Sequence, residues 1–238
     1  MDMRKITPGH IPMLTPMLTP MLTPMLTPKL ILSVLCMMVV MYSGCTSISK
    51  NHHFLQAQQS YFNADYVSAE TLFTRVLESD PNNTGALLYL GWINFYAQKY
   101  DPSRAYFQRV IQLEGVTDNA LADAHHGLAR CSYEVTQYSA TIEHAGKSLK
   151  RVPEVMELWL LLGWSQMYTY QYIAAESSFT RALDLETANP EAWLGIGWTL
   201  YYQSDYSGAM YAAGKARSYG FDEGLVLKLE NACRAITG

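Results

Sequence analysis

Apolar residues recur with the period of an α-helix over most of the chain beyond residue 50. Between residues 156 and 168 one stripe follows the spacing i, i+3, i+4, i+7. Its members are Trp159, Leu162, Gly163 and Gln166. After a short break a second stripe of the same kind runs through Tyr172, Ala175, Phe179, Ala182 and Leu183. The pattern therefore predicts two amphipathic helices joined by a turn.

The composition of the two stripes indicates how these helices pack. Gly163 and Ala175 are small enough to let the helices approach closely, and the bulky Trp159 and Phe179 fill the space to either side. A single hairpin of this size cannot bury both stripes, so further hairpins must stack on it.

The same pattern returns in steps of 34 residues. If Met156 is position 1 of a unit, the stripes occupy positions 4, 7, 8, 17, 20, 24 and 27. At these positions, the unit that begins at Pro190 has Trp193, Ile196, Gly197, Tyr206, Ala209, Ala213 and Ala216. The unit from Thr84 places there Leu87, Leu90, Gly91, Tyr100, Ser103, Phe107 and Val110.

Two further units follow the pattern less closely. The unit from Lys50 keeps Ala57, Tyr66, Ala69, Phe73 and Val76. The unit from Ala122 keeps Leu128, Ala129 and Tyr138, and departs from the pattern at His125, Thr141 and Ala145.

These spacings resemble the tetratricopeptide repeat, a helix-turn-helix unit whose signature is W-x2-L-G followed by Tyr, Ala, Phe and Ala. The resemblance covers roughly Lys50 to Phe221. It implies an all-α fold, a right-handed superhelical solenoid of about five helix hairpins with a capping helix at the C-terminal end. The expected repeats are residues 50–83, 84–121, 122–155, 156–189 and 190–221, followed by the cap at 222–238.

Helix boundaries can be predicted at several points. Asn189 is expected to cap the helix that begins at Pro190. Thr84 and Ala122 are separated by one helical turn more than the repeat length, so the next helix should begin near Asp118 or Asn119, after Gly115. In the cap, the packing stripe is expected at Leu225, Leu229, Ala232 and Ile236, with Lys228, Glu230 and Arg234 elsewhere.

Residues 1–44 resemble a bacterial lipoprotein signal with an N-terminal extension. Residues 13–28 repeat MLTP four times, and translation could also begin at Met25. The apolar run Leu30–Tyr42 follows Lys29 and is too short for a comfortable membrane span of about 20 residues. Ser43-Gly44-Cys45 resembles a lipobox, which implies lipidation of Cys45. An ordinary cleaved signal and an uncleaved anchor are the alternatives.

A lipobox implies a short tether at residues 45–49 and a location on the periplasmic side of the bacterial outer membrane, since Thr46 stands where a retention signal would place Asp. The net charge of −4 and the lack of a basic stripe argue against nucleic-acid binding. Cys131 and Cys233 are expected to be buried thiols, with an intermolecular disulfide as the alternative.

In this family the first helices line a concave groove, with positions 2, 5, 9, 12 and 13 facing it. The resemblance therefore implies a partner-binding groove at Trp92, Tyr96, Arg130, Tyr133, Glu134, Trp164, Tyr168, Trp198 and Tyr202. Aromatics at position 9 could also serve packing between repeats, but packing explains those at positions 12 and 13 less well. The basic residues of a carboxylate clamp are missing here, Arg130 excepted, which favours an apolar helix or extended segment as the guest.

The third unit places His126, Arg130 and Glu134 on one helix at i, i+4 and i+8. Arg130 and Glu134 could pair with each other on the helix surface, or they could fix the register of a guest on the aromatic floor.

The sequence offers no catalytic or cofactor site. Adjacent histidines, as in His52-His53 and His125-His126, point about 100° apart on a helix and make no metal site alone. We therefore expect a non-enzymatic adaptor or scaffold without metal or cofactor. Lipid-anchored relatives suggest assembly of an envelope machine, such as a pilus secretin, a cell-wall complex or an exopolysaccharide exporter. A glycan-binding protein whose aromatics stack on sugar rings is the alternative.

Overall fold

The computed structural model describes residues 52–237, and every regular element among them is an α-helix. Residues 52–62 form a helix, and it is followed by α2 (Tyr66–Ser79), α3 (Thr84–Tyr96), α4 (Tyr100–Gln112), α5 (Asp118–Glu134), α6 (Tyr138–Leu149), α7 (Met156–Tyr168), α8 (Tyr172–Leu185), α9 (Pro190–Tyr202), α10 (Tyr206–Ser218) and α11 (Glu223–Thr237). The predicted signal, the lipidation site Cys45 and the tether lie outside the described residues.

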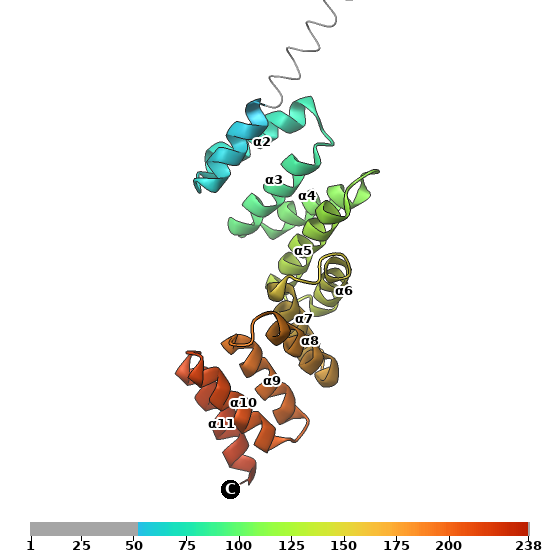
Figure 1. The fold of residues 1–238 in the computed structure, drawn as a ribbon. Helices are drawn as coiled ribbons and strands as arrows, with labels where there is room; N and C mark the ends of the chain where they lie inside the picture. The colour runs from blue at the N-terminus through green and yellow to red at the C-terminus, as the bar shows by residue number, and fades with distance from the viewer. Residues whose placement is uncertain (1–51, 238) are drawn as a thin grey trace, which may run out of the picture. The chain divides into compact units, whose positions relative to one another are not determined.

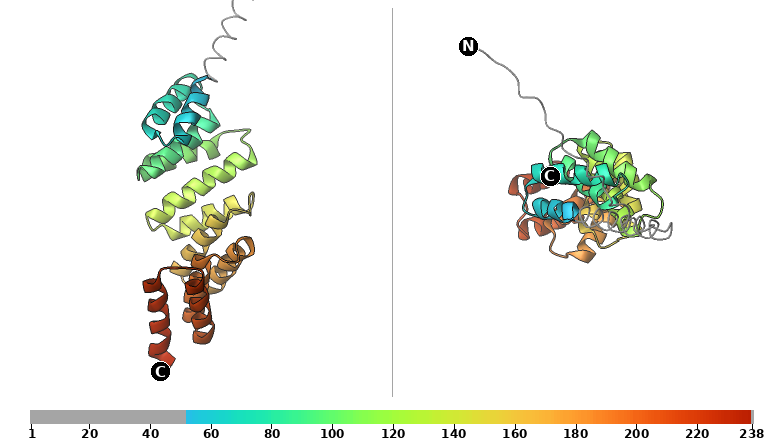
Figure 2. Two further views of the ribbon diagram at one scale, coloured as in Figure 1. Left: turned by 60° about the vertical axis from the view of Figure 1, so that its left-hand side comes forward. Right: turned by 90° about the horizontal axis from the view of Figure 1, so that it is seen from above.

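The helices pair into hairpins that stack in chain order. Each helix from α2 onward packs against the next one, and the first helices of successive hairpins also touch, from α3 to α5, α7, α9 and the cap α11. Figure 1 follows this order from α2 to α11, and the left view of Figure 2 shows the same order by colour from another side. The prediction of an all-α solenoid is confirmed.

Side-chain caps begin several of the first helices. Asn83, Thr117 and Asn189 each accept a hydrogen bond from a backbone N–H three residues on, which satisfies one donor left free at a helix start. Pro190 occupies the first turn of α9, as predicted. Helix α5 begins at Asp118 and has 17 residues against 13 in α3, α7 and α9, so the extra turn lies at its start.

A phenylalanine between two glycines sets the distance between successive hairpins. A Cβ added at Gly91 would lie 2.6 Å from the Phe107 ring, and a Cβ at Gly127 of the next first helix would also meet that ring. The same arrangement occurs two hairpins further along the chain, around Phe179. There the corresponding distances are 2.7 Å at Gly163 and 2.5 Å at Gly195. Each ring is fully buried and fills a slot that only glycine leaves open.

The third hairpin replaces this slot with smaller apolar groups and a histidine pair. Ala145 stands at the position of the phenylalanine and is fully buried beside Ala129. His125, at the position of the tryptophan, lies with its Nδ1 3.2 Å from Nδ1 of His144 on α6, and the two rings stack. Burial, with smaller contributions from His144, Lys147 and Arg151, lowers the pKa of His125 to about 4, and burial also lowers that of His144.

The cap α11 packs through a different face from the predicted one. Its buried residues are Val226, Leu229, Glu230 and Cys233. Leu225 and Ile236, which were expected inside, are 41% and 53% exposed. Glu230 is drawn inward because it pairs with Arg217 of α10 at 2.8 Å and with Arg234 at 3.3 Å. The prediction for this face was therefore wrong at Leu225 and Ile236 and correct at Leu229, while Ala232 is half-buried.

Both cysteines within the described residues are free and buried, as expected. The Cys131 sulfur lies 3.2 Å from the Ser103 hydroxyl. Between residues 52 and 237, no helix combines the length and apolar character needed to span a membrane.

The glycine slot predicts that Gly195→Ala destabilises the protein. The new methyl group would overlap the Phe179 ring, which costs about 1–3 kcal/mol, while the better helix propensity of Ala returns up to about 1 kcal/mol. We expect a net loss of about 1–2 kcal/mol in the free energy of unfolding, measured by urea denaturation. Gly214→Ala on α10 is the control, because nothing lies within 4 Å of its added Cβ. If both variants changed the free energy of unfolding by the same amount, the overlap with the Phe179 ring would not be the cause.

The histidine pair predicts a loss of stability in mild acid. The folded state keeps His125 neutral down to about pH 4, whereas an unfolded chain takes up this proton near its ordinary pKa of 6.5. The contribution of His125 to the free energy of unfolding should therefore be fully present above about pH 6.5 and should fall as the pH drops toward 4. The His125→Asn/His144→Asn double variant should show a smaller difference between urea midpoints at pH 7.5 and pH 5 than the parent does. The exposed His52→Asn variant serves as control, and an unchanged difference in the double variant would refute the assignment.

Candidate functional site

Residues at position 9 of the first helices join neighbouring repeats. The indole N–H of Trp92 donates to Asp123 at 3.0 Å, and that of Trp164 donates to Glu191 at 2.7 Å. Arg130, at the same position of the third repeat, donates to Glu157. Each acceptor is the acidic residue at position 2 of the following repeat. Position 9 therefore contributes to packing, one of its two predicted roles, and the polar tips of Trp92 and Trp164 are already engaged.

Tyrosines at position 13 present their rings to solvent at regular intervals. Tyr96, Tyr168 and Tyr202 are 50%, 48% and 50% exposed. Within its own helix each lies beside the position-9 tryptophan, with ring centroids 6.2, 6.5 and 6.2 Å apart for Trp92, Trp164 and Trp198. The predicted groove residues thus form Trp–Tyr pairs on three of the first helices.

A second set of tyrosines braces these rings from the preceding hairpin. Tyr66, Tyr138 and Tyr172 begin α2, α6 and α8 and stack on the position-13 ring of the next repeat. Centroid distances are 5.8 Å for Tyr66–Tyr96, 4.7 Å for Tyr138–Tyr168 and 5.0 Å for Tyr172–Tyr202. We call these six tyrosines the tyrosine ladder. Each of its steps spans two repeats, so its spacing depends on how the repeats stack.

The third repeat interrupts the ladder with charge. Arg130 bonds to Glu157 of the fourth repeat, and its guanidinium carbon lies 4.7 Å from the centroid of the Phe95 ring. The suggested pairing of Arg130 with Glu134 is therefore wrong, because the Arg130 side chain reaches across the repeat boundary. Glu134 stands where the second, fourth and fifth repeats carry the ladder tyrosine. Burial and then the Glu134 carboxylate raise the pKa of Tyr100, the position-17 tyrosine that faces it.

The carboxylates along this surface differ in their electrostatic state. Burial raises the pKa of Asp123, and the indole of Trp92 partly opposes that rise. The His126 ring, 3.6 Å away, holds the pKa of Glu157 below its usual value, with a further contribution from Arg130. Tyr133 is half-buried against Tyr138, and burial raises its pKa. The predicted groove therefore combines open aromatic rings with acidic groups that hold neighbouring repeats together.

The sequence patterns did not identify the bracing tyrosines as parts of this surface, and they placed position 2 in the groove without naming its acids. Tyr66, Tyr138 and Tyr172 were assigned only to the packing signature at position 17. A tyrosine recurring there together with one at position 13 of the next unit was the signal that could have found them. Among residues 52–237, no three His, Cys, Asp or Glu side chains are grouped so that they could hold a metal ion.

Solved structures with the same fold include several repeat proteins. One is YrrB, described as a TPR protein with an unusual peptide-binding site, with 16% identity, a TM-score of 0.68, and coverage of 79% of this chain and 97% of YrrB. A crystal structure of MamA has 16% identity, a TM-score of 0.64, and coverage of 71% of this chain and 91% of MamA. MamA from Desulfovibrio magneticus RS-1 has 15% identity, a TM-score of 0.62, and coverage of 77% and 96%. No curated protein matches the sequence.

A family model shows where the repeats lie without reference to the structure. The model for the tetratricopeptide repeat matches residues 54–115 and 160–223, which together are more than half of the chain. The third repeat, where His125, Thr141 and Ala145 replace signature residues, lies entirely between the two matches. The match, the period of 34 residues and the stacked hairpins agree, and the chain belongs to the tetratricopeptide-repeat family.

Proposed function

We propose that this protein is a non-enzymatic adaptor that binds a segment of a partner protein along the tyrosine ladder. The observation that carries the proposal is the set of half-exposed rings at Tyr96, Tyr168 and Tyr202, each fixed by a stacked tyrosine and a neighbouring tryptophan. Rigid aromatic rings lose little entropy on binding and bury a large area, so they are common anchors of protein interfaces.

The charge along the ladder favours a partner segment that is apolar with basic residues. Asp123, Glu134, Glu157 and Glu191 face this surface from positions 2 and 13, and Arg130 at position 9 is a cation among them. An apolar helix or an extended peptide could lay its side chains on the tyrosine rings while its Lys or Arg side chains meet the carboxylates. The peptide-binding site of YrrB, which shares the fold, supports a peptide as the guest.

We also propose that the protein is lipid-anchored through Cys45 at the periplasmic face of a bacterial outer membrane. The support is the sequence alone: Lys29, the apolar run Leu30–Tyr42 and the small residues before Cys45. An anchored adaptor would hold its partner at the envelope, and assembly of a secretin, cell-wall or polysaccharide-export machine is the role we propose. The lipid alone would attach the protein to the membrane, so no further membrane-binding surface is needed.

A crosslinking experiment tests the ladder. A p-benzoylphenylalanine probe at Tyr168 in living cells should capture one envelope protein, and capture should fall about tenfold or more when Tyr202→Ser removes a second ring. A probe at Tyr219, which is 41% exposed and lies outside the ladder, is the matched control.

Equal capture from the two probe positions, or capture that survives Tyr202→Ser, would show that the tyrosine ladder is not the surface that binds the partner. Retention of the protein in polysaccharide gels, lost in Tyr202→Ser and without any captured protein, would instead assign the ladder to glycans. Thermal unfolding of Tyr202→Ser and Tyr219→Ser checks that both variants remain folded.

The anchor is tested by Cys45→Ser. This variant cannot accept a lipid, so it should lose incorporation of labelled palmitate and leave the membrane fraction. Cys36→Ser, within the apolar run, removes a thiol without touching the lipobox and should behave like the parent. Palmitate labelling that persists in Cys45→Ser would refute the assignment.

A further inference from the structure

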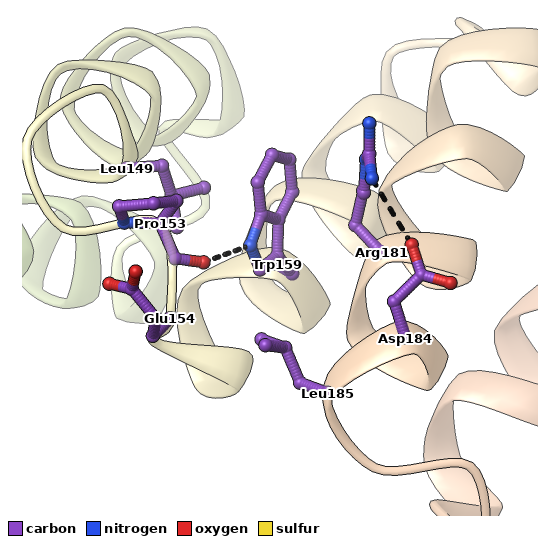
Figure 3. Close-up of a pocket in the computed structure, with 7 residues that line it drawn as sticks. All are labelled: Leu149, Pro153, Glu154, Trp159, Arg181, Asp184 and Leu185. Carbon is purple, nitrogen blue, oxygen red and sulfur yellow. Dashed lines mark hydrogen bonds and ion pairs between the residues drawn. The ribbon is translucent and has the colours of Figure 1, made fainter.

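A cleft of about 500 Å³ opens beside Trp159, where the third and fourth hairpins meet. Its walls come from α6, the loop before α7, α7 itself and α8. The lining residues are Leu149, Pro153, Glu154, Trp159, Arg181, Asp184 and Leu185. Figure 3 shows the Trp159 ring between Leu149 and Pro153 on one side and Arg181 and Asp184 on the other. None of these residues belongs to the tyrosine ladder.

In this cleft the Trp159 ring is held in place, whereas the Arg181 side chain at the edge is free to move. The indole N–H of Trp159 donates to the Pro153 carbonyl at 2.8 Å, which holds the ring in place. Arg181 and Asp184 form an ion pair at 3.2 Å with side chains 67% and 57% exposed. Exposed ion pairs of this kind contribute little stability, so Arg181 can turn toward a ligand at small cost.

At the next hairpin junction the corresponding tryptophan has a tyrosine of the protein itself beside it, and this tyrosine is 62% exposed. Trp193 stands 34 residues after Trp159, and its indole donates to the Thr187 carbonyl at 3.1 Å. The Tyr211 ring lies edge to face against Trp193, with centroids 6.2 Å apart and planes at 83°. The Lys215 amine lies 5.5 Å from the centroid of that ring.

When the two junctions are compared position by position, the Trp159 cleft has no residue that corresponds to the Tyr211 ring, but it has the tryptophan and the cation that lie beside that ring at the Trp193 junction. Arg181 corresponds to Lys215 in the repeat, so a cation is present at both junctions. Ser177 corresponds to Tyr211, and its hydroxyl bonds back to the Ile173 carbonyl within α8. The site therefore offers a tryptophan and a cation in the arrangement that the neighbouring junction uses to hold a tyrosine.

We propose that the Trp159 cleft is a second binding site, which takes a tyrosine side chain of a partner protein. The ring would stand edge to face on Trp159, and the Arg181 guanidinium would lie over its electron-rich face. The carboxylates of Glu154 and Asp184 at the rim can accept a hydrogen bond from the phenolic O–H, so the charges of the cleft complement those of a phenol.

Fluorine NMR of the full-length protein labelled with 6-fluorotryptophan tests this site, with N-acetyl-L-tyrosinamide as the probe. The Trp159 resonance, assigned with Trp159→Phe, should shift and saturate as the probe is added. Ser177→Tyr should abolish this shift, because the new ring would take the place of the probe against Trp159, as Tyr211 lies against Trp193. Tyr211→Ser should create a second probe-dependent shift, at Trp193. Arg181→Gln, on an exposed side chain, should weaken the Trp159 response several-fold.

Three results would overturn the proposal. One is a Trp159 resonance that does not respond to the probe, and another is a response of equal size in Ser177→Tyr. The third is a shift produced by methyl β-glucoside and not by the tyrosinamide, which would assign the cleft to a saccharide. Thermal unfolding of Ser177→Tyr confirms that a lost response is not a lost fold. Failure at Trp159 leaves the crosslinking result at Tyr168 unaffected, so the two sites are judged separately.

Discussion

The close approach of successive first helices around a single phenylalanine is the constraint on which this structure depends. Phe107 and Phe179 each lie between two glycines that belong to consecutive repeats. The rings are large and fully buried, so they provide much of the apolar contact between hairpins. Because a ring lies directly over each glycine, even one added methyl group forces the helices apart or the ring out of place.

The surface of the protein inherits its spacing from this contact. Only when first helices lie this close can a position-9 side chain reach the acid at position 2 of the next repeat, as Trp92 reaches Asp123. The Phe179 contact likewise brings Tyr172 onto Tyr202, whereas Tyr138 stacks on Tyr168 across the third hairpin, which has Ala145 in place of the phenylalanine. The ladder is thus a property of the stack, and its rings are held in place before any partner arrives. Such preorganisation lowers the entropic cost of binding.

The third hairpin shows that the stack tolerates a different chemistry when several positions change together. A small Ala145 stands where a phenylalanine would lie, and His125 pairs with His144 where a tryptophan would pack. On the ladder side, Arg130 and Glu157 replace the bond between an indole and a carboxylate. The boundary between the third and fourth repeats keeps both a polar cross-link and a ladder step, Tyr138 on Tyr168. The ladder is interrupted one boundary earlier, where Tyr100 meets Glu134 and not a tyrosine. Glu134 therefore gives the ladder a charged break.

Much of the architecture could be predicted because it depends on local order in the chain. The period of the apolar stripes indicated the helices, and the signature spacings identified the repeat. The four residues gained before Ala122 placed the start of α5 at Asp118 because one helical turn preserves the packing face. Asn189 and Pro190 marked the start of α9 through short-range hydrogen bonding and ring geometry.

The sequence by itself thus determined the helices, their order and the set of aromatic residues on the first helices. Only the tertiary structure decided which of these residues meet. Arg130 pairs with Glu157 and not with Glu134, and Glu230 is buried because Arg217 reaches it from α10. The open cleft at Trp159 and the Tyr211 ring against Trp193 also became visible only when the repeats were compared in space. Helical periodicity fixes the face on which a side chain lies, but contacts across repeats depend on the distance and angle between helices, and the packing of the whole stack sets these.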